Sequence, residues 1–274
     1  MKDYLRALTQ DSVDPIQGRN KAREYMQARI LESLQRSGAF INLAFHGGTA
    51  LRLLYGLQRF SEDLDFTLEN PSSNYDFQYY LNALKKMFIS EGYKLEIRLK
   101  LEKTVQSAFL KFIELPYELG LSPYRNENLS IKIEVDTNPP VGAGLVTTIV
   151  RRYVFLNLHH HDRSSLFAGK LHALLSRNFT KGRDLYDLMW YLSDPNWPSP
   201  NYVLLKNALI QTGWKKDIPD ERNWRVIVIE KVSSLDWKKV ISDVKPFLEN
   251  MDGDSLLTKD NLVSILRKSS KDQK

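Results

Sequence analysis

Apolar residues in the first 160 positions recur with two different periods. Helical spacing predicts helices over residues 22–34 and 79–90, whereas alternation of apolar and polar residues predicts strands over 94–100, 104–115 and 129–136. Residues 145–158 are rich in β-branched and aromatic side chains and predict one more strand. The first part of the chain is therefore expected to form a small mixed β-sheet with flanking helices.

The second part of the chain is helical in pattern throughout. Apolar residues at helical spacing predict helices over residues 163–177, 183–192, 202–211, 221–232, 237–248 and 255–267. The proline-rich segment 194–200 breaks the pattern between two of them. We expect an α/β (α+β) protein: an N-terminal domain over residues 1–160 with the small mixed sheet, and a C-terminal helical bundle domain over residues 161–274.

The amino-acid composition excludes several kinds of chemistry. The chain has 274 residues and no cysteine, which excludes disulfides, thiolate nucleophiles and zinc sites built on cysteine. No apolar run approaches the ~20 residues that a membrane helix needs, so we expect no membrane association and a cytoplasmic location. The net charge of +6 favours a polyanionic partner without proving one, because a solvated basic surface has the same composition.

Candidate chemistry is concentrated in residues 46–65. Gly47, Gly48 and Thr49 open a short apolar helix, and Asp63 and Asp65 begin a β-prone segment shortly afterwards. Residues two apart in a strand point to the same side, so both carboxylates can face one place. Carboxylates that face a glycine turn, whose backbone amides hold phosphate, form the arrangement needed to bind Mg²⁺ and a nucleoside triphosphate. This segment predicts a nucleotidyl-transfer site.

A third carboxylate is expected from the strand 129–136. Its polar face carries Lys132, Glu134 and Asp136, and Asp136 stands where the strand ends. Beside Asp63 and Asp65 it would complete a set of three carboxylates able to hold two divalent ions. The alternative is that Asp136 only forms the turn at the end of its strand.

Lys170 is the candidate cation for a triphosphate. It lies on or beside the apolar stripe of its helix, where a lysine either extends its ammonium to solvent or meets an anion. Asp184 and Asp187 share a face near the start of the next helix. Asp184 is a candidate to position Lys170 or the acceptor, and the alternative for both acids is a first-turn role that the helix dipole favours.

Two histidine features remain without an assigned role. His159, His160 and His161 are consecutive, so they cannot all face one ion from a regular strand or helix, and a polar turn between domains is the interpretation we favour. His172 lies one helical step from the face of Lys170 and is expected to be structural.

Together these motifs resemble a known family. Gly47-Gly48-Thr49 with Asp63 and Asp65 looks like the first motif of the DNA polymerase β-like nucleotidyltransferases. Lys170 followed by the segment 183–187 resembles the AbiEii/AbiGii-type nucleotidyltransferase toxins of bacterial abortive-infection and toxin–antitoxin systems. The similarity covers roughly residues 40–195. It implies a nucleotidyltransferase domain, a helical domain that completes the nucleotide site, and a cognate antitoxin protein as partner. It also implies Mg²⁺ and a nucleoside triphosphate, with transfer in some members to the 3′ end of tRNA.

The sequence thus predicts a Mg²⁺-dependent nucleotidyltransferase toxin with an RNA acceptor such as tRNA. Transfer to a protein side chain and a catalytically degenerate nucleotide-binding subunit are the alternatives. The expected roles are catalysis by Asp63, Asp65, Lys170 and Asp184, nucleotide binding by Gly47, Gly48, Thr49 and Lys170, and metal binding by Asp63, Asp65 and Asp136. Lys132, Arg151, Arg152 and Lys181 are the basic residues expected to contact an RNA acceptor.

Overall fold

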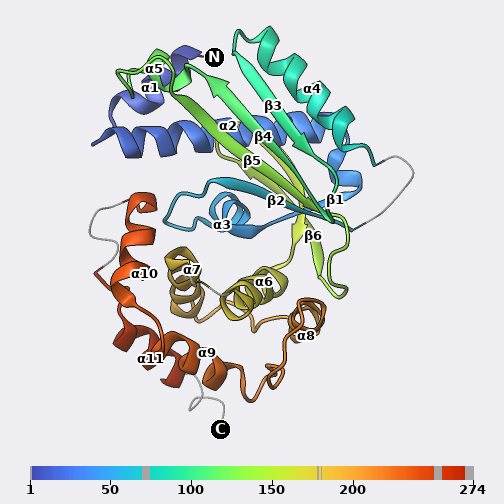
Figure 1. The fold of residues 1–274 in the computed structure, drawn as a ribbon, viewed down its shortest axis with the longest axis vertical. Coiled ribbons are helices and arrows are strands. Elements are labelled where there is room, and N and C mark those ends of the chain that lie inside the picture. The colour runs from blue at the N-terminus through green and yellow to red at the C-terminus, as the bar shows by residue number, and fades with distance from the viewer. Residues whose placement is uncertain (1, 70–74, 178, 180, 250–254, 269–274) are drawn as a thin grey trace. The chain divides into compact units, whose positions relative to one another are not determined.

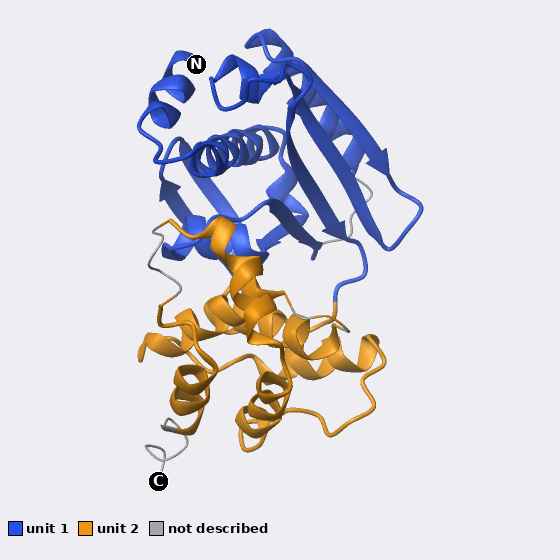
Figure 2. Cartoon of the chain, turned by 60° about the vertical axis from the view of Figure 1, so that its left-hand side comes forward, with its two compact units in different colours: residues 1–139, 145–160 blue, residues 140–144, 161–274 orange. Residues whose placement is uncertain are grey.

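The computed structural model of the chain describes residues 2–69, 75–177, 179, 181–249 and 255–268 (Figure 1). The chain divides into two units (Figure 2). Unit 1 comprises Met1–Pro139 and Leu145–His160, and unit 2 comprises Pro140–Gly144 and His161–Lys274. Within the described residues, no helix combines the length and the apolar character that a membrane span requires.

Unit 1 is built on a mixed seven-stranded sheet with the order β3-β4-β5-β2-β1-β7-β6. The strands β2 and β5 run parallel, as do β1 and β7, whereas the pairs β1–β2, β3–β4 and β4–β5 are antiparallel. The expected mixed sheet with flanking helices is thereby confirmed. The strands are β1 (Leu43–His46), β2 (Asp63–Leu68), β3 (Leu95–Lys100), β4 (Val105–Ile113), β5 (Asn128–Asp136), β6 (Leu145–Arg151) and β7 (Phe155–His161).

Helices complete unit 1 by covering the apolar side of the sheet. The long helix α2 packs on β5, and α4 packs on both α2 and β3. Asp14 caps α2 through the backbone N–H of Gln17, with Pro15 in the first turn, which is why the helix begins earlier than its apolar pattern indicates. The helices are α1 (Lys2–Gln10), α2 (Pro15–Arg36), α3 (Gly47–Tyr55), α4 (Phe77–Ser90) and α5 (Leu115–Glu118), with a 3₁₀ turn η1 (Ala39–Ile41).

The segment 145–158 differs from its prediction. One strand was expected, but the chain forms β6 and β7 with a turn between them. The turn is held on α2, because the buried carboxylate of Glu24 accepts a hydrogen bond from the Tyr153 hydroxyl at 2.7 Å and pairs with Arg152 at 2.9 Å. Glu24 is 129 residues from Tyr153 in sequence, so the local pattern contains no trace of this contact.

Unit 2 is helical, and each helix expected after residue 163 is present. Its core is aromatic in part: Phe167 stacks on Tyr191 with ring centroids 4.6 Å apart, and Trp224 packs edge-on against Phe167. The helical bundle predicted for this region is therefore confirmed. The elements are α6 (Arg163–Ser176), α7 (Gly182–Ser193), α8 (Tyr202–Gln211), α9 (Trp224–Ser233), α10 (Trp237–Val244), the 3₁₀ turn η2 (Lys245–Phe247) and α11 (Lys259–Lys268).

Candidate active site

The turn from β1 into α3 requires both of its glycines. Gly47 has a φ of +81°, in the region that favours glycine, and a Cβ at this position would lie 2.3 Å from Asp65 Oδ2. A Cβ on Gly48 would lie 2.9 Å from Ser61 Oγ and 3.0 Å from Arg59 Nη2. The backbone can approach these side chains so closely only because neither residue has a side chain. The first turn of α3, whose backbone N–H groups have no partner within the helix, thus lies directly beside the Asp65 carboxylate.

Asp63 and Asp65, here called the aspartate pair, lie on one face of β2. Both are half-buried, whereas Leu64 and Phe66 between and beyond them are fully buried. This alternation confirms that the two aspartates share the face that the hydrophobic core does not use.

A row of polar residues crosses the sheet at Asp65. His46 of β1 and Glu134 of β5 are the residues paired with Asp65 in the two neighbouring strands, and Ser107 of β4 is paired with Glu134. Residues paired across strands project from the same face of a sheet. Glu134 is therefore a carboxylate near Asp65 that the sequence analysis did not select, because the pairing of β2 with β5 depends on tertiary register.

Asp136 lies further along β5 than expected. It is paired with Thr67, two positions beyond Asp65, and its Oδ1 accepts a hydrogen bond from the Asn138 backbone N–H at 3.0 Å. The turn-forming role left open by the sequence is therefore present. Among the described residues, no group of three or more acidic or histidine side chains is gathered closely enough to hold a metal ion. Metal binding by Asp136 remains a prediction.

The donor set of this face nevertheless suits Mg²⁺. Magnesium prefers carboxylate oxygens and binds through one or two carboxylates together with substrate phosphates. The aspartate pair supplies two such groups, and Asp65 Oδ2 is the atom that a Cβ on Gly47 would strike. A divalent ion on this face would therefore have protein oxygens on one side and the α3 amides, suited to phosphate, on the other.

Thr49 is placed differently from a phosphate ligand. Its side chain is buried, and its hydroxyl donates a hydrogen bond to the backbone carbonyl of Asp63. This contact fixes the first turn of α3 to the strand that carries the aspartate pair. Phosphate binding by Thr49 stays a prediction for its backbone N–H, in the first turn of the helix.

Arg59 is a further residue that the sequence analysis missed. Its side chain is 2% exposed although it is an arginine, its Nη1 donates to the Phe60 carbonyl at 2.9 Å, and its Nη2 borders Gly48. The structure therefore places a buried guanidinium beside the glycine turn. The available signal was one of two arginines, Arg52 and Arg59, between the glycines and the aspartate pair, which is too common to select on its own.

Four charged side chains of unit 2, here called the lysine cluster, lie together: Lys170, Arg177, Asp184 and Asp187. The Lys170 ammonium lies 3.0 Å from Asp184 Oδ1 and 2.7 Å from Asp187 Oδ2, and Arg177 pairs with the other oxygen of Asp184. Both carboxylates are buried, at 4% and 0% side-chain exposure. The cluster contains two acids and two bases, so its formal charges balance.

Asp184 lies in the first turn of α7, as the alternative expected, and it also belongs to the lysine cluster. The Asp184 side chain does not cap its own helix, whose first position is preceded by Lys181 without a side-chain cap. The structure instead brings Asp184 together with Lys170, as the sequence analysis expected for a residue that positions the lysine. It also adds Asp187 and Arg177, which the sequence analysis had not given a role.

The histidines take structural positions in the described part of the chain. His159, His160 and His161 all lie in β7 rather than in a turn, so that expectation was wrong. The rings of His159 and His160 lie 3.3 and 2.9 Å from the hydroxyls of Thr147 and Thr148 of β6. His172 Nε2 lies 3.0 Å from the Thr212 hydroxyl. Burial, and secondarily the charge of Arg177, lowers the pKa of His172 below its usual value.

Two of the basic residues expected to meet RNA are engaged within unit 1. Lys132 forms an ion pair with Glu134 at 2.5 Å and lies over the ring of Phe109. Arg152 is committed to the buried carboxylate of Glu24. Their charges are therefore partly neutralised inside the unit.

Comparison with known proteins adds to this geometry. The family described as "Nucleotidyl transferase AbiEii toxin, Type IV TA system" matches residues 29–260. A search of curated proteins finds no match. Among solved structures, MenT4, a nucleotidyltransferase toxin from Mycobacterium tuberculosis H37Rv, is similar with a TM-score of 0.61 and 15% identity, covering 97% of this chain and 89% of that one. JHP933 from Helicobacter pylori is similar with a TM-score of 0.54 and 19% identity, covering 90% of this chain and 93% of that one.

These structural likenesses show a shared fold at low sequence identity, and the family match extends over most of the chain, including the aspartate pair and the lysine cluster. The protein is accordingly a nucleotidyltransferase and belongs to the AbiEii nucleotidyltransferase toxin family.

Proposed function

We propose that this enzyme is a Mg²⁺-dependent toxin that transfers a nucleoside monophosphate from a triphosphate to an RNA acceptor such as the 3′ end of tRNA. The observation that carries the proposal is the position of Asp65 against Gly47 at the start of α3. A carboxylate and a helix N-terminus meet there, and they are the groups that bind a divalent ion and a phosphate. A cytoplasmic location and a cognate antitoxin protein belong to the same proposal, on the strength of the family.

In this proposal Asp63 and Asp65 hold the metal, with Asp136 as the third carboxylate. When bound, such an ion shields the charge of the α-phosphate and lowers the pKa of the attacking hydroxyl. The register of the sheet offers Glu134 as a competitor for the third position, since it is paired with Asp65. Transfer measured for Asp136→Asn and Glu134→Gln over a series of Mg²⁺ concentrations separates the two, because loss of the true ligand raises the Mg²⁺ concentration needed for half-maximal transfer.

The chain's other groups act on the triphosphate. The backbone N–H groups of Gly48 and Thr49 bind phosphate oxygens, since the first turn of a helix leaves them without an internal partner. Lys170 neutralises further phosphate charge. Asp184 and Asp187 hold its ammonium in place, so the lysine loses little side-chain freedom when the nucleotide binds. The helical domain contributes to nucleotide binding through this lysine.

An RNA acceptor is favoured by the basic character of the chain, with a net charge of +6. The test is incubation with each labelled triphosphate, Mg²⁺ and either purified tRNA or a protein extract, over a series of salt concentrations. We expect label in tRNA, with transfer at low substrate concentration falling as salt rises, because single-stranded RNA loses affinity with a log–log slope of about −0.7 per phosphate contact. Label in protein alone would support nucleotidylation of a side chain, and no label in either would support a degenerate binding subunit.

A further inference from the structure

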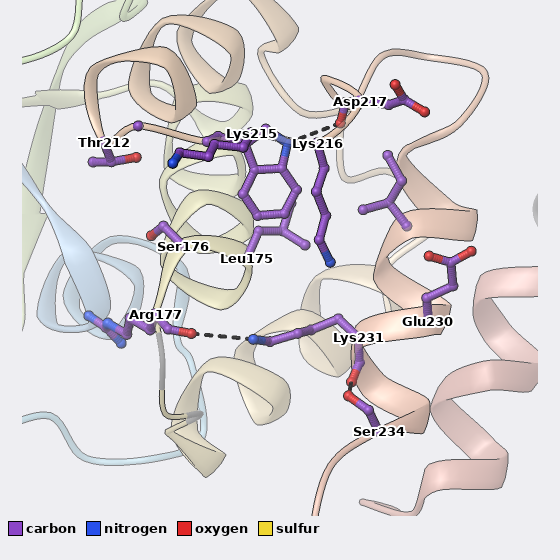
Figure 3. Close-up of a pocket in the computed structure, with 13 residues that line it drawn as sticks. Leu175, Ser176, Arg177, Thr212, Lys215, Lys216, Asp217, Glu230, Lys231 and Ser234 are labelled. Carbon is purple, nitrogen blue, oxygen red and sulfur yellow. Dashed lines mark hydrogen bonds between the residues drawn. The ribbon is translucent and has the colours of Figure 1, made fainter.

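Unit 2 contains a cavity of about 840 Å³ that the proposed nucleotide site does not use. It is lined by the end of α6, by the loop that follows α8, and by α9 (Figure 3). This volume lies within the range of ligand-binding sites. We call it the Trp214 cavity.

The lining of the Trp214 cavity is basic. Lys215, Lys216 and Lys231 contribute three cations, against the carboxylates of Asp217 and Glu230, whereas the guanidinium of Arg177 is paired with Asp184. Across the described residues, no ion pair holds any of the three lysines. Figure 3 shows the ammonium groups of Lys216 and Lys231 directed into the space, with Lys231 donating a hydrogen bond to the Arg177 carbonyl at 3.3 Å. Cations that are not neutralised by the protein favour an anionic occupant.

Trp214 is held in the cavity wall by the way in which α8 ends. Gly213 adopts a φ of +77°, its N–H donates to the Ile210 carbonyl, and the Trp214 N–H donates to the Leu209 carbonyl at 2.9 Å. These two bonds are the Schellman arrangement that follows a helix. The indole N–H donates in turn to the Asp217 carbonyl at 3.0 Å, which fixes the ring. The half-buried indole is therefore an oriented aromatic surface beside three lysines.

An aromatic surface next to flexible cations is what a single-stranded nucleic acid requires, because bases stack on the ring while cations meet the phosphates. Lys216 lies 5.8 Å from the centre of the Trp214 ring, at the outer limit of a cation–π contact, so it is free to move to a phosphate. An acidic peptide would meet the lysines but would leave the oriented ring of Trp214 without a stacking partner, whereas a nucleotide supplies both a phosphate and a base.

We propose that the Trp214 cavity binds a nucleotide of the single-stranded part of the RNA acceptor, with the base on Trp214 and the flanking phosphates on Lys216 and Lys231. The inference rests on the proposed function for the identity of the RNA as acceptor. Arg177 connects the cavity to the lysine cluster, because its side chain pairs with Asp184 while its backbone receives Lys231. RNA bound to Lys231 would therefore be linked through Arg177 to Asp184, the carboxylate that holds Lys170.

The experiment measures binding of a fluorescent, unstructured oligoribonucleotide to the full chain without Mg²⁺ or triphosphate, so that it does not depend on transfer. The variants are Trp214→Ala and the double variant Lys216→Gln/Lys231→Gln. We expect Trp214→Ala to weaken binding about 5- to 150-fold, the range for one stacked base. The double variant should reduce the log–log salt slope by about 1.4, at about 0.7 per phosphate contact. Lys239→Gln, an exposed lysine of α10 outside the cavity, is the matched control and should bind as wild type.

Two further measurements keep the outcomes separate. Thermal unfolding shows whether Trp214→Ala is folded; if it is not, the double lysine variant decides, since those side chains contribute little packing. Calorimetric binding of the Mg²⁺-triphosphate complex should be unchanged in both variants. Intact RNA binding in the double variant would overturn the inference while leaving the proposed function untouched.

Competition distinguishes the sources of a nucleotide. A triphosphate that displaces the oligoribonucleotide from wild type, and loses this ability in Trp214→Ala, would assign the cavity to a free nucleotide and overturn the RNA assignment. Cavity-dependent RNA binding together with label only in protein would refute the proposed acceptor and leave the cavity as an RNA site.

Discussion

The aspartate pair of unit 1 and the lysine cluster of unit 2 differ in how deeply their carboxylates are buried. The aspartate pair lies half-exposed on the polar face of a sheet, and Glu134, its neighbour across the sheet, is paired with Lys132. The lysine cluster buries its two carboxylates completely and balances them with Lys170 and Arg177. The first arrangement leaves its carboxylates half-exposed to solvent, whereas the second encloses its carboxylates together with two bases.

This difference determines how the stability of each region should respond when one of its charged residues is removed. A half-exposed carboxylate on the polar face of a sheet contributes little packing, so removing it costs the fold little. A buried and balanced cluster behaves in the opposite way, since removal of one partner leaves an uncompensated charge in the interior. Activity and stability should therefore separate in the first region and fall together in the second.

The largest expected effect is that of Asp65→Ala. Transfer should fall by at least about 10³-fold, because a metal ligand that is lost removes several kcal/mol of charge stabilisation in the transition state. The melting temperature should stay the same or rise. Transfer assays and thermal unfolding check both halves of this expectation. Glu96→Ala, a carboxylate on the edge strand β3, is the matched control and should keep full transfer. Substantial activity in Asp65→Ala would refute the assignment of the aspartate pair.

Lys170→Met should lower activity and stability together. Methionine keeps the length of the stem but removes the ammonium that both Asp184 and Asp187 contact, which costs about 3–5 kcal/mol for a buried pair broken on one side. Loss of a charge-assisted contact to the triphosphate adds about 1.5–3 kcal/mol in the nucleotide-dependent step, or roughly 10- to 150-fold.

A second variant separates the two effects of Lys170→Met. The double variant Lys170→Met/Asp187→Asn removes one buried charge with the lysine, so it should recover part of the stability without recovering transfer. Denaturant unfolding and calorimetric binding of the triphosphate measure the two quantities. A Lys170→Met protein as stable and active as wild type would mean that the lysine cluster contributes to neither.

A matched pair of glycine substitutions compares the two regions directly. Gly47→Ala should be strongly harmful to transfer, because its Cβ would strike Asp65 Oδ2 and its φ is positive. Gly169→Ala, next to Lys170 in the exposed face of α6, meets nothing within 4 Å and should stabilise the protein by about 0.5–1 kcal/mol with transfer unchanged. Equal effects of the two substitutions on transfer would argue against a tight fit of Asp65 at the glycine turn.

The same two regions show how much of the candidate site could be predicted from the sequence. The shared face of Asp63 and Asp65 follows from the period of a strand, and the approach of Asp184 to Lys170 was expected from their helices. The residues that were missed depend on contacts between distant segments. Glu134 becomes relevant only through the pairing of β2 with β5, and Arg177 only because the chain after α6 returns to α7. Patterns within one element carry no information of this kind.

The fold follows the same rule. The helices of unit 2 were found from their apolar period, whereas β1, with only four residues, is too short for its period to be recognised. The prediction of one strand over 145–158 was wrong because the turn between β6 and β7 is fixed on Glu24 of α2. The placement of Asp136 beside Thr67 likewise required the register of the sheet.

The smallest expected effect concerns His172, beside the lysine cluster. Burial first, and then the charge of Arg177, lowers the pKa of His172 in the folded protein below its unfolded value of about 6.5. At pH 7.5 both states are neutral here, and the histidine contributes no pH dependence. As the pH falls through about 6.5, the unfolded chain takes up a proton that the folded protein resists, so stability is lost.

The variant His172→Gln tests this expectation, because glutamine can keep a hydrogen bond to Thr212 but cannot titrate. Its advantage over wild type in melting temperature should therefore be larger at pH 5.5 than at pH 7.5, and Asp65→Ala, which alters only the aspartate pair, should show no such change relative to wild type near pH 6.5. A gap between wild type and His172→Gln that is constant with pH would show that the ring is not held neutral by its surroundings.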